Sequence, residues 1–253
     1  MSRLPRPLPH LARLAAVWIA VATSASAQTR PTPQALIARH DSIVGGRAAF
    51  ETHQSVRLTG TFGVPMVGLE GPLEILKIRP DRFLLRATLG PLGEILSGFD
   101  GRTGWSVQPG QGPRVMTGPE AAMLATQADF FADLHDLAQF SAVESLSDTT
   151  FEGRAVLPVR LVRSTGETVT EYFDRETGLS AGSRVVVQGP QGEMEVIGVL
   201  ADYRRFGAVQ IPTRRIQRTA MLETVLTIRE LVFDGVGPAD VAPPPAVQAL
   251  IRP

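Results

Sequence analysis

Most of the chain alternates apolar and polar residues with a period of two, which is the pattern of half-buried β-strands. Val56, Leu58 and Phe62 alternate in this way with Arg57 and other polar residues. Similar stretches separated by Gly, Pro and Asp-Gly turns are expected at residues 73–78, 82–88, 94–99, 103–108, 114–117, 142–146, 154–163, 168–174, 179–188, 194–206, 210–218 and 223–233. Short strands at this spacing, with turn residues between them, predict an antiparallel β protein of about eleven strands.

Two stretches change to helical spacing. The first begins at Pro33, behind the N-cap residue Thr32, and ends at Gly45; a short helical turn is expected to follow at residues 47–52. The second covers residues 119–140. Its apolar residues recur three or four positions apart: Met123, Leu124, Phe131 and Leu134.

A single sheet of about eleven strands must curl, and curling produces a concave face. The predicted fold class is therefore mostly β with α: a curved antiparallel sheet that forms an unclosed β-barrel covered by a helical lid. Helices over a concave face leave room beneath them for an apolar ligand.

The N-terminus has the order of a secretory signal peptide, predicted at residues 1–27. Basic residues without acids precede an apolar run of nine at residues 14–22, and residues 25–27 form a small-x-small cleavage site. Nine residues are far fewer than the roughly 20 that a membrane-spanning helix needs. We therefore expect an exported protein that is soluble in the periplasm after cleavage; an uncleaved anchor is the alternative. A domain at residues 28–237 and a proline-rich C-terminal tail at residues 238–253 would follow.

Charge and cysteine content exclude several classes of function. Residues 1–27 hold three of the 25 basic residues and none of the 25 acidic ones, so the remainder carries 22 against 25, a net charge near −3. This balance gives no electrostatic basis for binding nucleic acid. The absence of cysteine excludes disulfides, a thiolate nucleophile and a lipid-bearing N-terminal cysteine. Lys77 is the only lysine.

Several turn motifs resemble those of the periplasmic LolA-like proteins, a family that includes lipoprotein carriers and acceptors. Residues 96–105 contain a strand–turn–strand segment of the form DG-x-T-x-W, and residues 78–83 (IRPDRF) resemble a second family turn. Residues 171–178 and 203–212 resemble later hairpins. The order of signal, helix, strands, helix and strands covers most of the chain.

This resemblance implies an unclosed barrel with a helical lid and a cavity for acyl chains. The function it implies is a non-enzymatic periplasmic carrier or binding protein for a lipid or an acylated protein, with a membrane donor or acceptor protein as a further partner. The alternative is an envelope sensor or scaffold that binds a protein partner with the same fold. Neither function requires a cofactor.

Apolar residues on both elements are candidates for the cavity and its lid: Val56, Leu58, Phe62, Trp105, Met123, Leu124, Phe131 and Leu134. The alternative is that they pack the sheet against the helices. Arg79, Arg82 and Arg86 are candidates for contact with a lipid head group; a solvated strand face is the alternative.

We predict no catalytic or metal site. Asp129, Asp133, His135 and Asp136 lie on the predicted second helix, but no second histidine lies one turn away, so a solvated face is expected. His40 and His53 are expected to be ordinary surface or boundary residues. The serines lie outside any G-x-S-x-G context: Ser42, Ser97 and Ser106.

Overall fold

A computed structural model describes residues 30–189 and 192–251. The predicted signal peptide, residues 1–27, lies outside the described residues. The described residues from Pro31 onward form one compact unit. No helix in the described ranges is long and apolar enough to cross a membrane.

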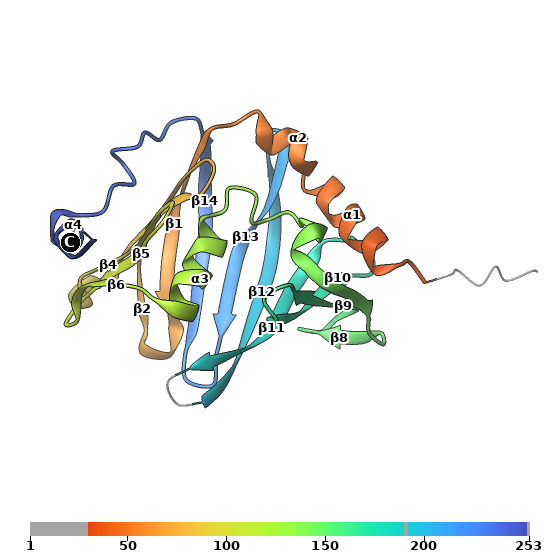
Figure 1. Cartoon of the computed structure of the whole chain (residues 1–253). Helices are drawn as coiled ribbons and strands as arrows, with labels where there is room; N and C mark the ends of the chain where they lie inside the picture. The colour runs from red at the N-terminus through yellow and green to blue at the C-terminus, as the bar shows by residue number, and fades with distance from the viewer. Residues whose placement is uncertain (1–29, 190–191, 252–253) are drawn as a thin grey trace, which may run out of the picture. The chain divides into compact units, whose positions relative to one another are not determined.

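Fourteen strands of the described unit form one antiparallel sheet (Figure 1). The strands are β1 (Ser55–Val64), β2 (Leu69–Ile78), β3 (Arg82–Thr88), β4 (Glu94–Asp100), β5 (Gly104–Gln108), β6 (Gly112–Val115), β7 (Phe140–Ser145), β8 (Thr149–Phe151), β9 (Arg154–Arg163), β10 (Thr168–Asp174), β11 (Ser180–Gly189), β12 (Gly192–Phe206), β13 (Val209–Arg218) and β14 (Glu223–Phe233). The helices are α1 (Pro33–Ile43), α2 (Gly46–Glu51), α3 (Gly118–Ala128) and α4 (Pro245–Ile251), with 3₁₀ turns at Pro65–Val67, Gly90–Leu92 and Leu137–Gln139.

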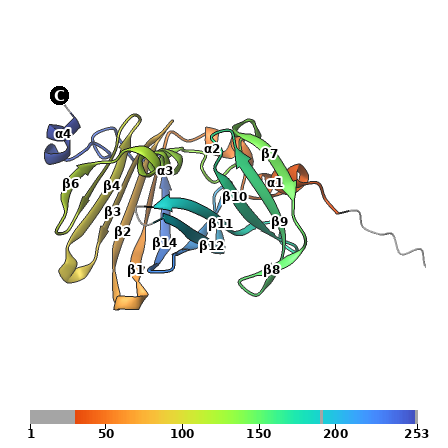
Figure 2. The same ribbon diagram turned by 60° about the horizontal axis from the view of Figure 1, so that its bottom comes forward.

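The strand order is β6-β5-β4-β3-β2-β1-β14-β13-β12-β11-β10-β9-β7, with β8 paired to β9. The first and last long strands are therefore neighbours, and β6 and β7 are the two edges. The sheet is curved but not closed; in Figure 2 the strands β1–β6 form one wall and β9–β10 the other. The predicted fold class is confirmed, with fourteen strands instead of about eleven. Of the fourteen strands, β8 is the one without a counterpart among the stretches expected above, and its three residues are too few to show an alternation.

The predicted helix over residues 119–140 was wrong in its length. α3 ends at Ala128, and residues 129–136 form a non-helical segment, here called the cover segment. The carboxylate of Asp129 accepts a hydrogen bond from the Phe131 backbone N–H at 2.9 Å, and such local bonds compete with helix continuation. The Phe130 N–H instead donates to the carbonyl of Pro80 at 3.0 Å, in the turn between β2 and β3.

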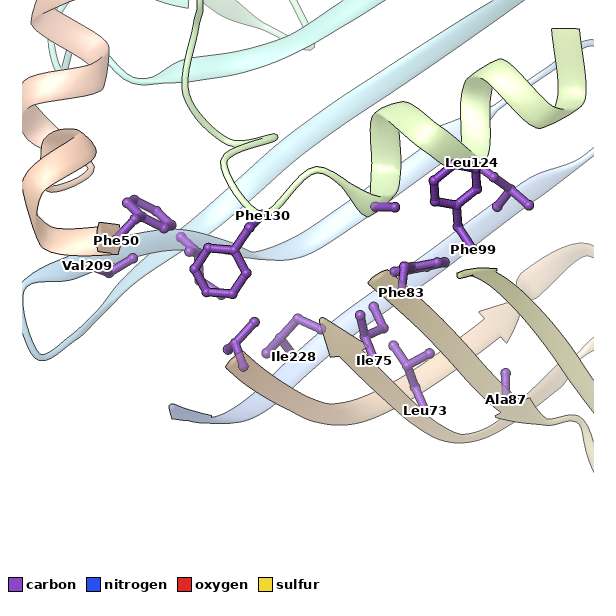
Figure 3. Close-up of a cluster of buried hydrophobic side chains, with 13 residues drawn as sticks. Phe50, Leu73, Ile75, Phe83, Ala87, Phe99, Leu124, Phe130, Val209 and Ile228 are labelled. Atoms are coloured by element: carbon purple, nitrogen blue, oxygen red, sulfur yellow. The ribbon is translucent and has the colours of Figure 1, made fainter. Parts of the chain in front are cut away.

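The main hydrophobic core lies on the concave face of the sheet. Phe50 of α2, Leu124 of α3 and Phe130 of the cover segment pack there against side chains of β1–β4, β13 and β14. Figure 3 shows Phe130 between Phe50 and the strands that carry Ile75 and Ile228.

A second cluster lies on the convex face. Trp105 of β5 packs there with Leu76 and Leu84, and the C-terminal segment covers them with Val241 and Val247. The proline-rich residues 238–251 thus lie along the outside of β5 and β6, with α4 on the side away from α3 (Figure 1).

Candidate functional site: an apolar hollow with a charged end

A hollow of about 670 Å³ lies between the concave face of the sheet, α2 and the cover segment. Its size falls in the range of about 300–1,000 Å³ that is usual for ligand pockets. Its lining is mainly aliphatic and aromatic, and comes from both halves of the curved sheet. The apolar lining includes Phe50, Val56, Leu58, Phe62, Ile75, Phe83, Leu85, Ile95, Phe130, Val185, Val196, Leu200, Val209, Ile211, Ile216, Leu222, Leu226, Ile228, Leu231 and Phe233.

Strand β1 places the three predicted cavity residues in this hollow. Val56, Leu58 and Phe62 all line it, since residues two apart on a strand share a face. Leu58 is opposite Leu231 of β14 in the antiparallel register, and Leu231 lines the hollow as well. The pairing of β1 with β14 therefore contributes side chains of both strands to the lining of the hollow.

Trp105 does not line the hollow. The structure corrects this prediction: its side chain is fully buried on the convex face, over Gly98 and beneath the C-terminal segment. A Cβ atom at Gly98 would clash with the Trp105 ring, so the glycine makes room for the indole. The DG-x-T-x-W segment thus has a packing role on the outside of the sheet.

The four predicted lid residues separate into three environments. Met123 is 50% exposed on α3 and does not line the hollow. Leu124 is buried in the main core, where it packs against Gly104. Phe131 and Leu134 lie in the cover segment and line a second, smaller pocket of about 280 Å³.

The three predicted head-group arginines do not line the hollow. Arg86 is on the convex face, where it pairs with Glu74 at 2.9 Å and Glu94 at 3.4 Å. The Arg79 guanidinium donates to the carbonyl of Glu51 at 3.1 Å and so ties the β2–β3 turn to α2. Arg82 is exposed at the start of β3. The positions of these three arginines fit solvent-exposed or structural roles.

The hollow contains a charged end that the sequence pattern does not reveal. Of the residues that line the hollow, three carry charge: Lys77, Asp133 and Arg215. One nitrogen of the Arg215 guanidinium donates to both carboxylate oxygens of Asp133, at 3.0 and 3.1 Å. The Lys77 Nζ donates to the carbonyl of Asp129 at 3.1 Å. These bonds hold the cover segment across the end of the hollow.

The surroundings of these groups change their protonation. Burial lowers the pKa of Lys77 to about 8, an effect that the nearby carboxylate of Asp133 only partly offsets. Burial acts to raise the pKa of Asp133, but the Arg215 and Lys77 cations outweigh it and lower that pKa below its usual range. The pair Asp133–Arg215 therefore stays ionised, and Lys77 titrates near neutral pH.

A second polar cluster anchors the other side of the cover segment. His135 Nδ1 lies 2.8 Å from a carboxylate oxygen of Asp41 on α1, and its Nε2 lies 2.7 Å from Glu171 on β10. Burial acts to lower the pKa of His135, but the two carboxylates raise it to about 10. His135 is therefore a cation at neutral pH and donates to both acids. The predicted solvated face is wrong for His135 and for Asp133, since both are half-buried and paired.

The residues His40, Asp41 and His135 bring one ligand atom each within 4.8 Å of the others, a spacing that a metal ion could use. The hydrogen bonds that these residues make in the structure favour a role other than metal binding. His40 is buried, and its Nδ1 accepts from the backbone N–H of Ser180 at 3.0 Å. Both ring nitrogens of His135 already face carboxylates. The cluster fits an imidazolium held between two acids.

Four turns at the far end of the hollow carry no charge. Antiparallel pairing brings together the turns at residues 65–69, 89–93, 108–112 and 219–222, of which the first and last lie at the lower end of Figure 1. They expose large apolar side chains: Met66, Val67, Leu92, Met221 and Leu222. The turns at the opposite end, such as residues 79–82, are rich in charge. Lys77 lies toward the charged turns, at the level of Val56, whereas Arg215 enters the hollow from β13 at the level of Leu226 and Phe62.

The sequence matches no family model and no curated protein. Several solved structures match it in fold. A LolA superfamily protein of Nitrosomonas europaea is similar at a TM-score of 0.53 and 12% identity, with 85% of this chain and 99% of that chain covered. A DUF1329 family protein of Desulfovibrio piger is similar at a TM-score of 0.53 and 9% identity, covering 84% of this chain and 98% of that one.

An outer membrane lipoprotein-sorting protein domain of Vibrio parahaemolyticus is similar at a TM-score of 0.51 and 12% identity, with 83% of this chain and 95% of that chain covered. All three coverages are nearly complete. The chain therefore has the LolA-like fold, as the turn motifs of the sequence indicated. At these identities the likeness establishes the fold alone.

Proposed function

We propose that this protein is a periplasmic, non-enzymatic carrier or binding protein for an acyl chain of a lipid or an acylated protein. The observation that carries the proposal is the hollow of about 670 Å³, whose walls are apolar over most of their surface. Each CH₂ group transferred from water into such a hollow contributes roughly 0.8 kcal/mol. Binding of a long chain then requires no chemical step.

Two further features support this function. The signal peptide predicted at residues 1–27 would deliver the chain to the periplasm, where acylated proteins and lipids must cross water between membranes. The uncharged turns with Met66, Met221 and Leu222 surround the apolar end of the hollow, and would let a chain pass without meeting a fixed charge.

Titration with the neutral fluorescent probe N-phenyl-naphthylamine tests the proposal. The protein is prepared without residues 1–27 and refolded after removal of lipid. It is expected to bind one molecule of the probe per chain in a saturable way. Long-chain lipids should then displace the probe. Native protein that gives no increase of probe fluorescence would contradict the proposal.

The second candidate is an envelope sensor or scaffold that binds a protein partner. It is favoured by the edge strand β7, where an unpaired strand edge can accept a strand from a partner. A defined protein that binds at β7 with one-to-one stoichiometry while the hollow stays empty would support this function over the carrier.

A further inference from the structure

The charges in the hollow do not cancel. Lys77 and Arg215 are positive and Asp133 is negative, and the rest of the hollow's described lining carries none. The lining therefore has a net charge of about +1 when Lys77 is protonated, and the carboxylate of Asp129, which lies outside the lining, also acts on Lys77. A buried charge without a partner is costly, so the lining favours a ligand that supplies one negative charge.

Lys77 has donors to spare. Its Nζ has three N–H groups, and one of them bonds to the Asp129 carbonyl. Among the described residues no carboxylate lies within ion-pair distance of its Nζ. Its strand position explains why it faces the hollow: Lys77 and Ile75 are two residues apart on the inward face of β2, whereas Leu76 between them packs on the convex face.

Arg215 also has guanidinium donors that no described residue accepts from, and it lines the hollow. A single nitrogen of its guanidinium serves both oxygens of Asp133, and a guanidinium has five N–H groups in all. Its side chain is 35% accessible, and it lines the hollow. Asp133 thus fixes the orientation of Arg215 without using its full capacity.

We propose that Lys77 and Arg215 form an anion subsite, and that the ligand is a long-chain fatty acid whose carboxylate binds there. This inference rests on the proposed function and names the ligand class for the same hollow. A monoanionic head balances the net charge, whereas a neutral or cationic head leaves it uncompensated. The volume of the hollow, about 670 Å³, lies in the range of pockets that hold one small-molecule ligand, and this suits a single acyl chain.

The hollow is long enough for such a chain. Lys77 is opposite Val56 in the β1–β2 register, and Phe62 lies six residues further along β1. At a rise of about 3.3 Å per residue, this distance is about 20 Å. With its head at Lys77, the chain runs along β1 past Leu58 toward Phe62 and Leu222, away from Lys77.

Binding should depend on pH through Lys77. The charged groups that act on Lys77 are Asp133, Arg215 and Asp129, and burial outweighs them to give a pKa of about 8. A bound carboxylate favours the ammonium form and raises that pKa. By linkage, the fatty acid binds more weakly as the pH rises above about 8, because the free protein has then lost the proton.

The test is displacement of N-phenyl-naphthylamine by three ligands of equal chain length: palmitate, hexadecanol and hexadecyltrimethylammonium. The wild-type protein, at neutral pH, is expected to bind palmitate about tenfold more tightly than hexadecanol, the effect of one charge-assisted hydrogen bond, and the ammonium ligand most weakly. Lys77→Met, which keeps the length and removes the charge, should lower the affinity for palmitate about tenfold and so abolish its preference over hexadecanol. Arg86→Met, on the convex face, should keep the preference and serves as the control.

The outcomes separate the two proposals. Equal affinity for palmitate and hexadecanol in the wild type, or a preference that survives in Lys77→Met, overturns the anion subsite while chain binding stands. Failure of all three ligands to displace the probe, or of the probe to bind, contradicts the carrier function and the subsite with it. Because Lys77 is the only lysine, ¹³C-methylation of amines gives one side-chain NMR signal beside that of the N-terminal α-amine, and palmitate should raise the titration midpoint of the side-chain signal, which is absent from Lys77→Met. An unchanged midpoint overturns the subsite even if Lys77→Met fails to fold.

Discussion

The imidazole of His135 donates from Nε2 to the carboxylate of Glu171 over 2.7 Å, and so joins the cover segment to β10. Both partners are nearly buried, with 12% and 13% of their side-chain surface accessible. His135 also holds Asp41 of α1 from its other nitrogen. One cation therefore connects three parts of the chain that lie far apart in the sequence.

Replacement of His135 by glutamine should destabilise the protein by about 3–5 kcal/mol, because it leaves two buried carboxylates without a cation. Urea unfolding measures this loss. The matched control is His53→Gln, whose ring pairs with Asp234 in a more exposed position and should cost much less. Equal losses for the two variants would contradict the role given to His135.

The stability difference between wild type and His135→Gln should depend on pH. The pKa of His135 is raised from 6.5 to about 10, so its stabilisation is complete below 6.5 and is lost as the pH rises toward 10. The pKa of Glu171 is lowered from 4.5 to about 2, so its part is complete above 4.5 and is lost as the pH falls toward 2. The difference should be largest between pH 4.5 and 6.5. A difference that is constant over pH 5–10 would rule out this ion pair as its source.

A tryptophan at position 231 should block the hollow. Leu231 lines it opposite Leu58, whereas the next residue, Val232, is exposed on the other face of β14. Leu231→Trp is expected to weaken binding of N-phenyl-naphthylamine at least about tenfold, and Val232→Trp to leave it unchanged. If both variants bind the probe as the wild type does, the probe occupies another place.

Two neighbours on α3 should differ sharply in their contribution to stability. Leu124 is buried against Gly104, so Leu124→Ala is expected to cost about 2–5 kcal/mol. Met123 is half exposed, so Met123→Ala should change the free energy of unfolding by less than about 0.5 kcal/mol. Thermal or urea unfolding of the two variants checks this; a large cost at Met123 would show that it packs against something in solution.

The fluorescence of Trp105 should report the C-terminal segment and not the hollow. Of the two tryptophans, Trp18 lies in the predicted signal peptide, so Trp105 alone remains after its removal. Deletion of residues 238–253 uncovers the indole and should shift its emission to longer wavelength. Ligand in the hollow should leave the emission wavelength unchanged; a shift on binding would place the ligand on the convex face.

Much of the fold could be predicted from local pattern. The alternation of Val56, Leu58 and Phe62 identified one face of β1, and the order of turns and strands identified the LolA-like fold. The end of α3 at Ala128 could not be predicted in the same way. The segment after it is held by Pro80, Asp41, Arg215 and Glu171, which come from distant parts of the chain.

The site residues show what the alternation of residues along a strand can and cannot predict. It establishes that Ile75 and Lys77 share a face, and that Leu84 and Arg86 share another, but not which face is concave. Lysine is seldom buried, so the nearby arginines were the natural candidates for a head group. The signal that was present is the isolation of Lys77: it is the only lysine, and it follows inward-facing apolar residues on β2.

Photo-crosslinking with a fatty acid that carries a diazirine at the end of its chain shows where an acyl chain binds, and so decides whether it occupies the hollow. After irradiation and proteolysis, mass spectrometry should locate the label on the inner residues far from Lys77 along the strands, such as Phe62, Leu222 and Leu226. Label confined to the convex face around Trp105 and α4, or no specific label at all, would contradict binding in the hollow.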